Sequence, residues 1–338
     1  PCFIGDGPTQ SVLSENNTTA VIFRIAGLAS SHYMIRDLGF TASVTRLGGA
    51  FVETTGSQGF IHRVRFNKCY HCLDISDQAT MVRDTSFNEG ETTALAAAQY
   101  VRIGANVPGP GGNACDYGCS LDNIFTGTVN VGNQPAFGIN VIKAGALQIA
   151  NSNIIRAGNA LNITPSSGTV AGVMCINSFF DNSSNGIVIR PTGTGSVVRA
   201  TFSGCGGTSS TNTGIYIENA GSGTVSGFDF INCYAYLSGG SGVFVSGVVS
   251  DINFTACKGT QNVVYGIVVD ANVSNFTITG GCWGACGGLL GNGQYGIAVV
   301  AGTSDHYIIS NNRVRGNTIG TVFDGGSGVN KSVTANIN

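Results

Sequence analysis

Two acidic residues, Glu218 and Asp270, occupy the same position in a five-residue pattern that recurs along the second half of the chain. Each copy begins with glycine and has apolar residues at its second and fourth positions. If the copies stack as strands about 4.8 Å apart, residues two copies apart have backbones separated by roughly 10 Å. Side-chain reach could bring the carboxyl groups to the roughly 6.5–9.5 Å that an inverting glycosidase needs for its acid, water and base. We therefore take Glu218 and Asp270 as the candidate catalytic pair.

Three residues at neighbouring positions of the pattern could bind a substrate. Arg190 lies one copy before Glu218, and its charge would keep that carboxylate ionised, which suits a base better than an acid. Tyr216 and Phe244 occupy the middle position of adjacent copies, where outward rings could stack against sugars. The alternative is that these residues have only a structural role. An exposed Arg190–Glu218 pair would then be a surface ion pair that contributes under about 1 kcal/mol to stability, and the two rings would only pack against each other across strands. A register shift of one residue would turn all of these side chains inward.

A second polar cluster is predicted nearer the amino terminus. Glu53, Asp74 and Arg102 fall on three consecutive strands of a weaker form of the pattern, where Arg102 could neutralise Asp74. The basic stretch FIHRVRF (residues 60–66) follows on an adjacent turn, and acidic sugars would favour such a stripe. An ordinary ion-pair patch is the simpler interpretation, and it is the one that we favour.

The elements that must position these residues are short strands at a regular spacing. The clearest copies begin 28, 28, 24 and 30 residues apart, at Gly186, Gly214, Gly242, Gly266 and Gly296. Weaker copies cover residues 49–53, 72–75, 100–103, 138–141, 160–163 and 320–323. A period of this length is typical of a solenoid, and the alternation puts the apolar residues on one face. We predict an all-β fold, a parallel β-helix of about a dozen rungs, with at most a short helical turn at residues 92–100.

A second strand follows each of the clear copies, and four of these strands end on a cysteine: Cys205, Cys233, Cys257 and Cys282. A coil that returns to one side-chain type per turn stacks it on itself, so we predict a ladder of buried thiols. A zinc site needs four converging ligands, and the remaining cysteines form only scattered pairs, so we expect neither metal nor cofactor. We expect reduced cysteines, as in a reducing cytoplasm; the alternative left open is a local disulfide between Cys115 and Cys119.

The amino-acid composition limits the classes to which this protein can belong. Only 10% of the 338 residues are charged and the net charge is −2, which gives no electrostatic case for binding nucleic acid. No apolar run approaches the roughly 20 residues of a membrane span, so we expect no membrane insertion. The 51 glycines, with asparagine, supply turns for the corners of a coil. We predict one domain over residues 1–338 with a loop insertion around 104–120, and flanking domains outside the given chain.

The opening of the chain carries a family resemblance in the stretches FIGDG (3–7), TTAVIFRI (18–25) and YMIRDLGF (33–40). It resembles the first coils of right-handed parallel β-helix proteins in the pectate-lyase-like superfamily, and most of all the phage tailspikes. The resemblance implies a right-handed single-stranded coil, a homotrimer, bacterial surface polysaccharide as the ligand and other virion tail proteins as partners. It places the protein in the virion tail after synthesis in the host cytoplasm.

Three functions are compatible with these features. The first is a tailspike that binds and hydrolyses capsule or O-antigen during host adsorption. The second is a non-catalytic receptor-binding or structural shaft of a virion, and the third is a secreted pectate-lyase-like enzyme. Lyases of this superfamily typically use calcium held by clustered aspartates, and the sequence has no such cluster, so hydrolysis is favoured over elimination.

Overall fold

The computed structural model describes residues 1–26, 32–55, 58–90, 98–105, 114–115, 118–126 and 134–337. Every element in these residues is a β-strand, which confirms the all-β prediction. Contacts divide the chain into two compact units, unit 1 (residues 1–162 and 168–174) and unit 2 (residues 163–167 and 175–338). Of the predicted helical turn at 92–100, residues 92–97 lie outside the described residues, and residues 99 and 100 belong to a strand, Gln99–Ile103. Most of the predicted insertion at 104–120 also lies outside the described residues, and the single domain stays a prediction.

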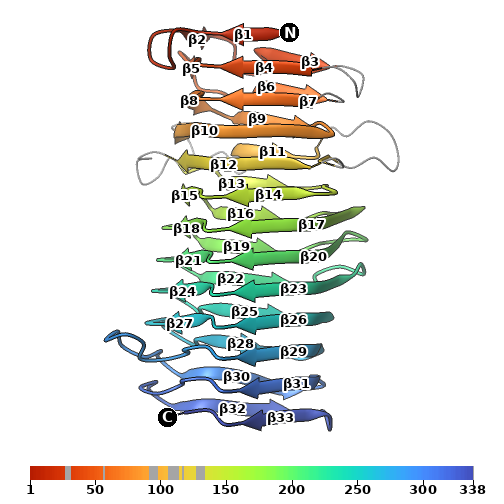
Figure 1. The fold of residues 1–338 in the computed structure, drawn as a ribbon, viewed down its shortest axis with the longest axis vertical. Helices are drawn as coiled ribbons and strands as arrows, with labels where there is room; N and C mark the ends of the chain where they lie inside the picture. Colours follow the sequence, from red (N-terminus) through yellow and green to blue (C-terminus); the bar gives the residue numbers. More distant parts are fainter. Residues whose placement is uncertain are drawn as a thin grey trace. The chain divides into compact units, whose positions relative to one another are not determined.

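One sheet, sheet B, receives one strand from each turn of the chain (Figure 1). Its strands in unit 1 are β3 (Phe23–Ala26), β6 (Ala50–Thr55), β9 (His71–Ser76), β11 (Gln99–Ile103), β13 (Phe137–Val141) and β16 (Asn159–Ile163). Those in unit 2 are β19 (Asn185–Ile189), β22 (Thr213–Glu218), β25 (Val243–Ser246), β28 (Ile267–Val269), β30 (Tyr295–Gly302) and β32 (Gly320–Gly326). Neighbours pair in parallel, and the clear and weak copies of the pattern all fall on these strands.

The other sheet, sheet A, receives one long or two short strands per turn. Unit 1 contributes β1 (Cys2–Ile4), β2 (Val12–Glu15), β4 (His32–Arg36), β5 (Gly39–Ala42), β7 (Gln58–His62), β8 (Arg65–Cys69), β10 (Ala79–Gly90), β12 (Cys119–Thr126), β14 (Leu147–Ala150), β15 (Asn153–Ile155) and most of β17 (Thr169–Ile176). Unit 2 contributes β18 (Phe179–Asp181), β20 (Ser196–Ser203), β21 (Gly206–Thr208), β23 (Val225–Ile231), β24 (Tyr234–Tyr236), β26 (Val249–Thr255), β27 (Lys258–Thr260), β29 (Val273–Thr279), β31 (Asp305–Ser310) and β33 (Lys331–Thr334).

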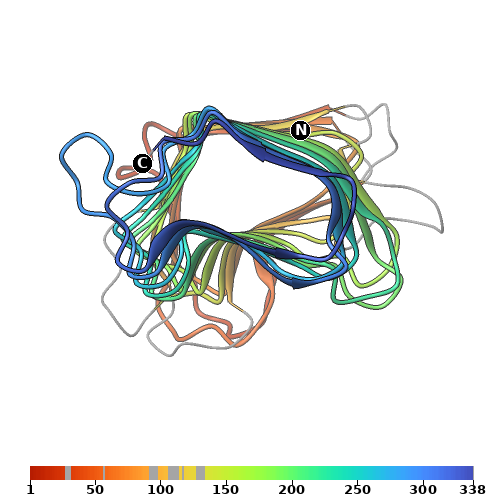
Figure 2. The same cartoon turned by 90° about the horizontal axis from the view of Figure 1, so that it is seen from below.

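In each turn, sheet A bends at a residue with positive φ that lies between its two strand segments. In unit 2 this position is held by small or amide residues: Asn177, Gly204, Asn232, Ala256, Gly280, Asn311 and Ala335. Asparagine and glycine tolerate this conformation better than other residues do. The repeated bend explains why successive turns of unit 2, coloured green to blue, follow nearly one outline when viewed along the stack (Figure 2).

The core of unit 2 consists of side-chain ladders, one residue per turn. Phe202, Phe230 and Phe254 are in register on β20, β23 and β26. Their ring centroids are 4.8 and 5.0 Å apart and the rings are nearly parallel. Because parallel strands place identical positions directly above one another, one apolar residue per period is enough to build a continuous core.

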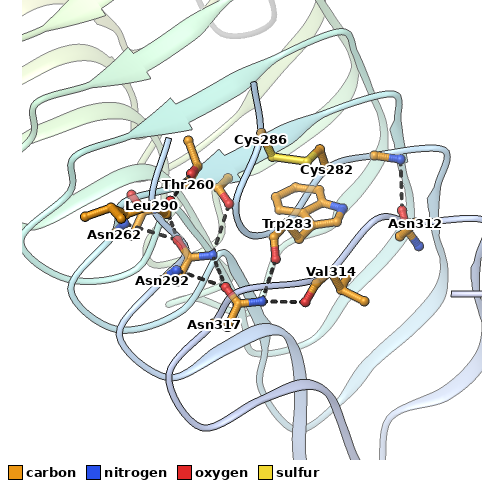
Figure 3. The surroundings of a disulfide bond; sticks show 12 residues. Thr260, Asn262, Cys282, Trp283, Cys286, Leu290, Asn292, Asn312, Val314 and Asn317 are labelled. Carbon is orange, nitrogen blue, oxygen red and sulfur yellow. Dashed lines mark hydrogen bonds between the residues drawn. A yellow bond between two sulfur atoms is a disulfide. The ribbon is translucent and has the colours of Figure 1, made fainter. Parts of the chain in front are cut away.

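Buried asparagines satisfy backbone groups at one corner of unit 2 (Figure 3). The side-chain amide of Asn262 donates to Asn292, and that of Asn292 donates to Asn317, both at 2.9 Å. The same acceptor oxygens receive backbone N–H groups of Asn262 and Asn292. A chain turning inside the protein would otherwise leave these N–H groups unpaired, so the ladder holds the corner closed.

The predicted thiol ladder is present, with one correction. Cys205, Cys233 and Cys257 are buried and free, and Cys175 precedes them. The sulfur atoms of Cys175 and Cys205 lie 3.4 Å apart. The placement of Cys282 in this ladder is wrong, because Cys282 forms a disulfide with Cys286 (Figure 3).

Two more local disulfides join Cys69 to Cys72 and Cys115 to Cys119. The expectation of reduced cysteines therefore fails for the six paired residues, whereas the alternative for Cys115 and Cys119 is confirmed. The two cysteines of each pair are only three or four positions apart in the sequence, so each disulfide is local.

These assignments predict the outcome of thiol titration. Without reductant, the native protein should show one reactive thiol, the exposed Cys2, and the denatured protein should show five of its eleven cysteines. Reduction before denaturation should raise the count to eleven. A count of eleven in the unreduced, denatured protein would contradict the three disulfides and show that all the cysteines are reduced.

Candidate functional site

The residues predicted from the five-residue pattern lie along sheet B in unit 2, in the predicted register. Val188 is opposite Tyr216, and Tyr216 is opposite Phe244. Glu218 is opposite Ser246 at the end of the same strand pair. The flanking isoleucines and valines of these strands are buried in the core, so the middle and final positions of each copy face outward.

Arg190, Tyr216 and Glu218 form one contact group. The guanidinium of Arg190 forms an ion pair with the carboxylate of Glu218, and the Tyr216 hydroxyl donates to Glu218 Oε2 at 2.8 Å. Burial, together with the Glu218 charge, raises the pKa of Tyr216 to about 12. The hydrogen bond to Glu218 raises the pKa of Arg190. Both donors therefore keep their protons at neutral pH and hold the Glu218 carboxylate in one position.

Asp270 does not join this group. It follows β28 two rungs from Glu218, and its backbone N–H donates to the carbonyl of Val245 at 2.8 Å. Its carboxylate accepts the backbone N–H of Ala271 at 2.8 Å. Glu218 and Asp270 thus have separate partners, and catalysis by this pair stays a prediction.

The rings of Tyr216 and Phe244 stack on each other, with centroids 5.3 Å apart and planes within 8° of parallel. In the register column they lie between Val188 and Val268, which are only 3% and 4% exposed. Each ring therefore has a side chain on both faces and presents mainly its edge to solvent. This packing favours the structural interpretation of the rings, while sugar binding by Tyr216, Phe244 and Arg190 stays a prediction.

The second predicted cluster is present in unit 1 on three consecutive rungs. Glu53 is opposite Asp74, and Asp74 is opposite Arg102. Arg102 forms an ion pair with Asp74, whose side chain is fully buried, which confirms the predicted neutralisation. Glu53 pairs instead with Arg24 at 3.3 Å.

Burial dominates the proton affinities in this cluster. It raises the pKa of Asp74, an effect that Arg102 opposes and the nearby Glu53 charge supports. Burial, with the nearby Arg102 charge, also lowers the pKa of His71, on the same strand, to about 4. A buried carboxylate neutralised by its arginine is a structural ion pair, so we assign no chemistry to Glu53, Asp74 and Arg102.

A groove follows the outward face of sheet A in unit 1. Three neighbouring concavities of about 340–420 Å³ share Met81 and Ser120 in their linings. The residues along the groove are in register from rung to rung: Met34, Phe60, Met81, Ser120 and Gln148. The Gln148 amide reaches the sulfur of Met174 at 4.0 Å. With rungs about 4.8 Å apart, the four steps of this column extend roughly 19 Å, and we call it the sheet A groove.

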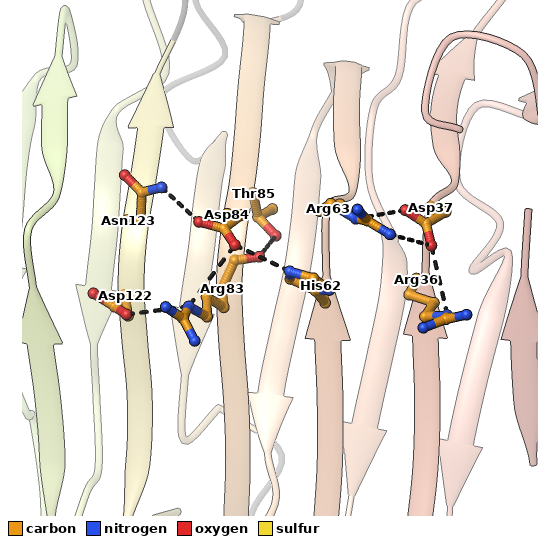
Figure 4. Close-up of polar contacts among 9 residues, drawn as sticks. All are labelled: Arg36, Asp37, His62, Arg63, Arg83, Asp84, Thr85, Asp122 and Asn123. Carbon is orange, nitrogen blue, oxygen red and sulfur yellow. Dashed lines mark hydrogen bonds and ion pairs between the residues drawn. The ribbon is translucent and has the colours of Figure 1, made fainter. Parts of the chain in front are cut away.

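A charged column lies two residues further along the same strands and borders the groove: Arg36, His62, Arg83 and Asp122 (Figure 4). Arg83 is 3.5 Å from Asp122 and 3.8 Å from Asp84. The ring of His62 stacks on Phe60, with centroids 5.4 Å apart. An apolar floor beside planar, hydrogen-bonding side chains is an arrangement that suits sugar rings and their hydroxyls.

The bend of sheet A in unit 1 is built from polar residues with positive φ: Asp37, Arg63, Asp84, Asn123 and Asn151. We call these five residues the corner ridge. Arg63 forms an ion pair with Asp37 at 2.7 Å, and Asn123 donates to Asp84 at 2.5 Å (Figure 4). The left-handed conformation is costly for arginine, and here it turns the charged side chains toward one another.

His62 and Asp84 form the pair with the clearest potential for proton transfer. His62 Nε2 lies 3.0 Å from Asp84 Oδ2. The hydrogen bond from Asn123, with support from His62 and Arg83, lowers the pKa of Asp84. An ionised carboxylate that orients an imidazole is a common way to hold a proton donor or acceptor near neutral pH.

Sequence reasoning found only part of this region. The basic stretch at 60–66 was identified, but Asp84 and Asp122 were not connected with it. The contact depends on the bend at Arg63 and on the pairing of β7 with β10, which no local pattern encodes. In the part of the chain that the structure describes, no group of three or more His, Cys, Asp or Glu residues is placed to hold a metal ion.

Fold and site together define a parallel β-solenoid with an open groove along its sheet. The family model for the right handed beta helix region matches residues 137–319. The chain belongs to this family, which confirms the parallel β-helix predicted from the repeats. A search of the curated proteins finds no match.

Among solved structures, the chain is similar to the A-module of the mannuronan C-5 epimerase AlgE4 from Azotobacter vinelandii. The match has 12% sequence identity and a TM-score of 0.52, and it covers 98% of this chain and 83% of that one. At this identity the similarity concerns the fold alone.

Proposed function

We propose that this β-helix protein binds an extended polysaccharide along the sheet A groove of unit 1. The observation that carries the proposal is the continuous groove, whose floor is Phe60 and Met81 and whose border is the charged column. Met81 is 48% exposed and lies in register with Phe60, and a contiguous exposed apolar surface often marks a ligand-binding groove. A column of roughly 19 Å suits several consecutive sugar residues.

We further propose that the polysaccharide is capsule or O-antigen and that the protein acts in a phage tailspike. Support comes from the resemblance of residues 3–40 to the first tailspike coils. The A-module that shares the fold belongs to a mannuronan epimerase, so this architecture is compatible with a polysaccharide ligand. In this proposal the protein is a homotrimer in the virion tail, contacts other tail proteins there and is made in the host cytoplasm.

The groove proposal predicts a loss of affinity when its floor is removed. Phe60→Ala should weaken binding of the recognised polysaccharide by about tenfold or more, as expected for a central aromatic contact. Binding would be measured by calorimetry, after a screen of bacterial capsule and lipopolysaccharide preparations identifies the ligand.

Phe125→Ala is the matched control, because Phe125 is 46% exposed on β12 and lines none of the three concavities. Equal affinity for the wild type and both variants would place the binding site elsewhere and refute the groove.

Cleavage is the second candidate function, and the fixed position of Glu218 favours it. If Glu218 acts as the base of a hydrolase, Glu218→Gln should abolish the release of reducing ends and leave binding intact. Reducing ends and the ultraviolet absorbance of unsaturated uronates would be followed together. Reducing ends alone indicate a hydrolase, and both signals indicate a lyase.

Asp251→Asn serves as the control, since Asp251 is an exposed carboxylate that bonds to Ser250 on sheet A. Undiminished cleavage by Glu218→Gln would remove Glu218 from the site and direct attention to His62 and Asp84. The absence of both signals, with binding retained, would favour the non-catalytic shaft.

A further inference from the structure

A separate concavity of about 300 Å³ lies on the other side of the corner ridge in unit 1. It is formed by the outward residues of β2, β5 and β8 and by the turn at Pro8 and Thr9. Its cause is a missing side chain. Val12, Gly39 and Arg65 are in register on the three strands, so Gly39 leaves a gap between its two neighbours.

The gap at Gly39 is enforced by the backbone. A Cβ atom at this position would lie 2.3 Å from the carbonyl oxygen of Pro8 and 3.1 Å from a methyl group of Val12. The turn therefore closes over the strand only because residue 39 is glycine, and the notch beside Arg65 is part of the fold.

The polar lining of this notch consists of one positive charge and groups that can donate hydrogen bonds. Arg65 is its only charged residue, and Asn67, Thr41 and Thr9 add amide and hydroxyl groups that can donate hydrogen bonds. Pro8 and Val12 supply an apolar wall. The guanidinium is a fork of N–H donors that matches the two oxygens of a carboxylate or phosphate.

Arg65 differs from the arginines of the charged column and the corner ridge. Arg36 and Arg63 pair with Asp37, and Arg83 pairs with Asp84 and Asp122. Among the described residues, no carboxylate lies within ion-pair distance of Arg65. Arg65 is thus a cation without an ion pair among the described residues, and it lines a notch of ligand size.

We infer that the notch at Gly39 and Arg65 is an anion subsite that binds a carboxylate or phosphate group carried on a saccharide. The anion would accept hydrogen bonds from Arg65, with Asn67 and Thr41 beside it, while the sugar ring packs on Pro8 and Val12. The inference rests on the proposed function only in naming a saccharide as the carrier of the anion. It further requires that the polysaccharide recognised by the groove carries an acidic group.

The test uses three small probes on the whole chain: sodium glucuronate, inorganic phosphate and the uncharged methyl glucoside. Binding would be followed by amide chemical shifts, with Thr41 and Asn67 as reporters. Glucuronate should bind in preference to methyl glucoside, and Arg65→Gln should weaken its binding by about tenfold or more, as expected for a charge-assisted hydrogen bond. Arg315→Gln removes an equally exposed arginine from unit 2 and should leave binding unchanged.

Each outcome decides something. Binding of glucuronate alone supports a sugar carboxylate, and binding of phosphate, alone or as well, supports a phosphorylated sugar. No binding of either anion, or binding that Arg65→Gln does not change, overturns the subsite. Anion binding that depends on Arg65 while Phe60→Ala leaves polysaccharide affinity intact would retain the subsite and reject the groove. If Phe60→Ala weakens polysaccharide binding while anion binding does not depend on Arg65, the groove is retained and the subsite is rejected.

Discussion

Replacing Phe230 with alanine is expected to lower the free energy of unfolding by about 3–5 kcal/mol, the usual cost of removing a buried aromatic side chain. Phe230 is fully buried and stacks between Phe202 and Phe254. The rungs above and below are held in register by backbone hydrogen bonds, so they cannot move together to fill the space. The cavity would therefore persist, and the measured cost should lie toward the upper end of the range.

Urea unfolding followed by circular dichroism would measure this effect as a lower midpoint with an unchanged slope. Phe179→Ala is the matched control in the same unit, because Phe179 is 46% exposed and its ring packs edge-on against the Tyr234 ring. The control should cost less than about 1 kcal/mol. Similar losses for the two variants would show that the ladder does not support the core.

The ladder of Phe230 also explains why so much of the fold could be predicted from the sequence. A parallel coil repeats the same environment once per turn, so Gly214 and Gly242 mark equivalent places in the structure as well as in the sequence. Counting from these glycines was enough to place Tyr216 beside Phe244, and the weaker copies at 72–75 and 100–103 placed Asp74 beside Arg102. In this architecture, spacing along the chain translates directly into contact between side chains.

The candidate groove was harder to predict because it depends on a bend that has no glycine. The stretch FIHRVRF was assigned to one strand, but the positive φ of Arg63 divides it into β7 and β8. His62 therefore borders the sheet A groove, whereas Arg65 lines the notch beyond the corner ridge. Two basic residues only three positions apart thus belong to different sites.

The prediction that Cys282 is a reduced member of the thiol ladder failed for a related reason. A count of cysteines at strand ends correctly placed Cys233 in the buried ladder, but it treated Cys282 as another equivalent position. The chain after Cys282 turns at once, and the turn returns Cys286 to it. A local departure from the repeat is therefore where prediction from periodicity fails.

The largest electrostatic effect is expected from Arg102→Met, which should lower the free energy of unfolding by about 3–5 kcal/mol at neutral pH. Removing one member of a buried pair leaves the other charge without compensation, and the Asp74 side chain has no exposure to solvent. The exposed pair of Arg190 and Glu218 provides the control. Arg190→Met makes the same exchange where the side chains are 50% and 25% exposed, and it should cost under about 1 kcal/mol.

The pH dependence of this effect has a definite sign. Burial already raises the pKa of Asp74 in the folded protein, and Arg102 opposes that rise. Without Arg102 the folded-state pKa rises further, so the folded variant binds a proton more readily than the unfolded chain does. Its deficit should therefore be largest above the folded-state pKa of Asp74, where the carboxylate is ionised in both states, and shrink as the pH falls below that pKa toward the unfolded value.

A second substitution separates charge from packing. Adding Asp74→Asn to Arg102→Met removes the uncompensated charge while keeping the shape of the side chain, so the double variant should recover much of the lost stability and lose the pH dependence. Urea midpoints measured between acidic and neutral pH for the two variants would test both points. If the single variant loses the same stability at every pH, its cost comes from lost packing of the arginine, and the buried Asp74 charge is not its origin.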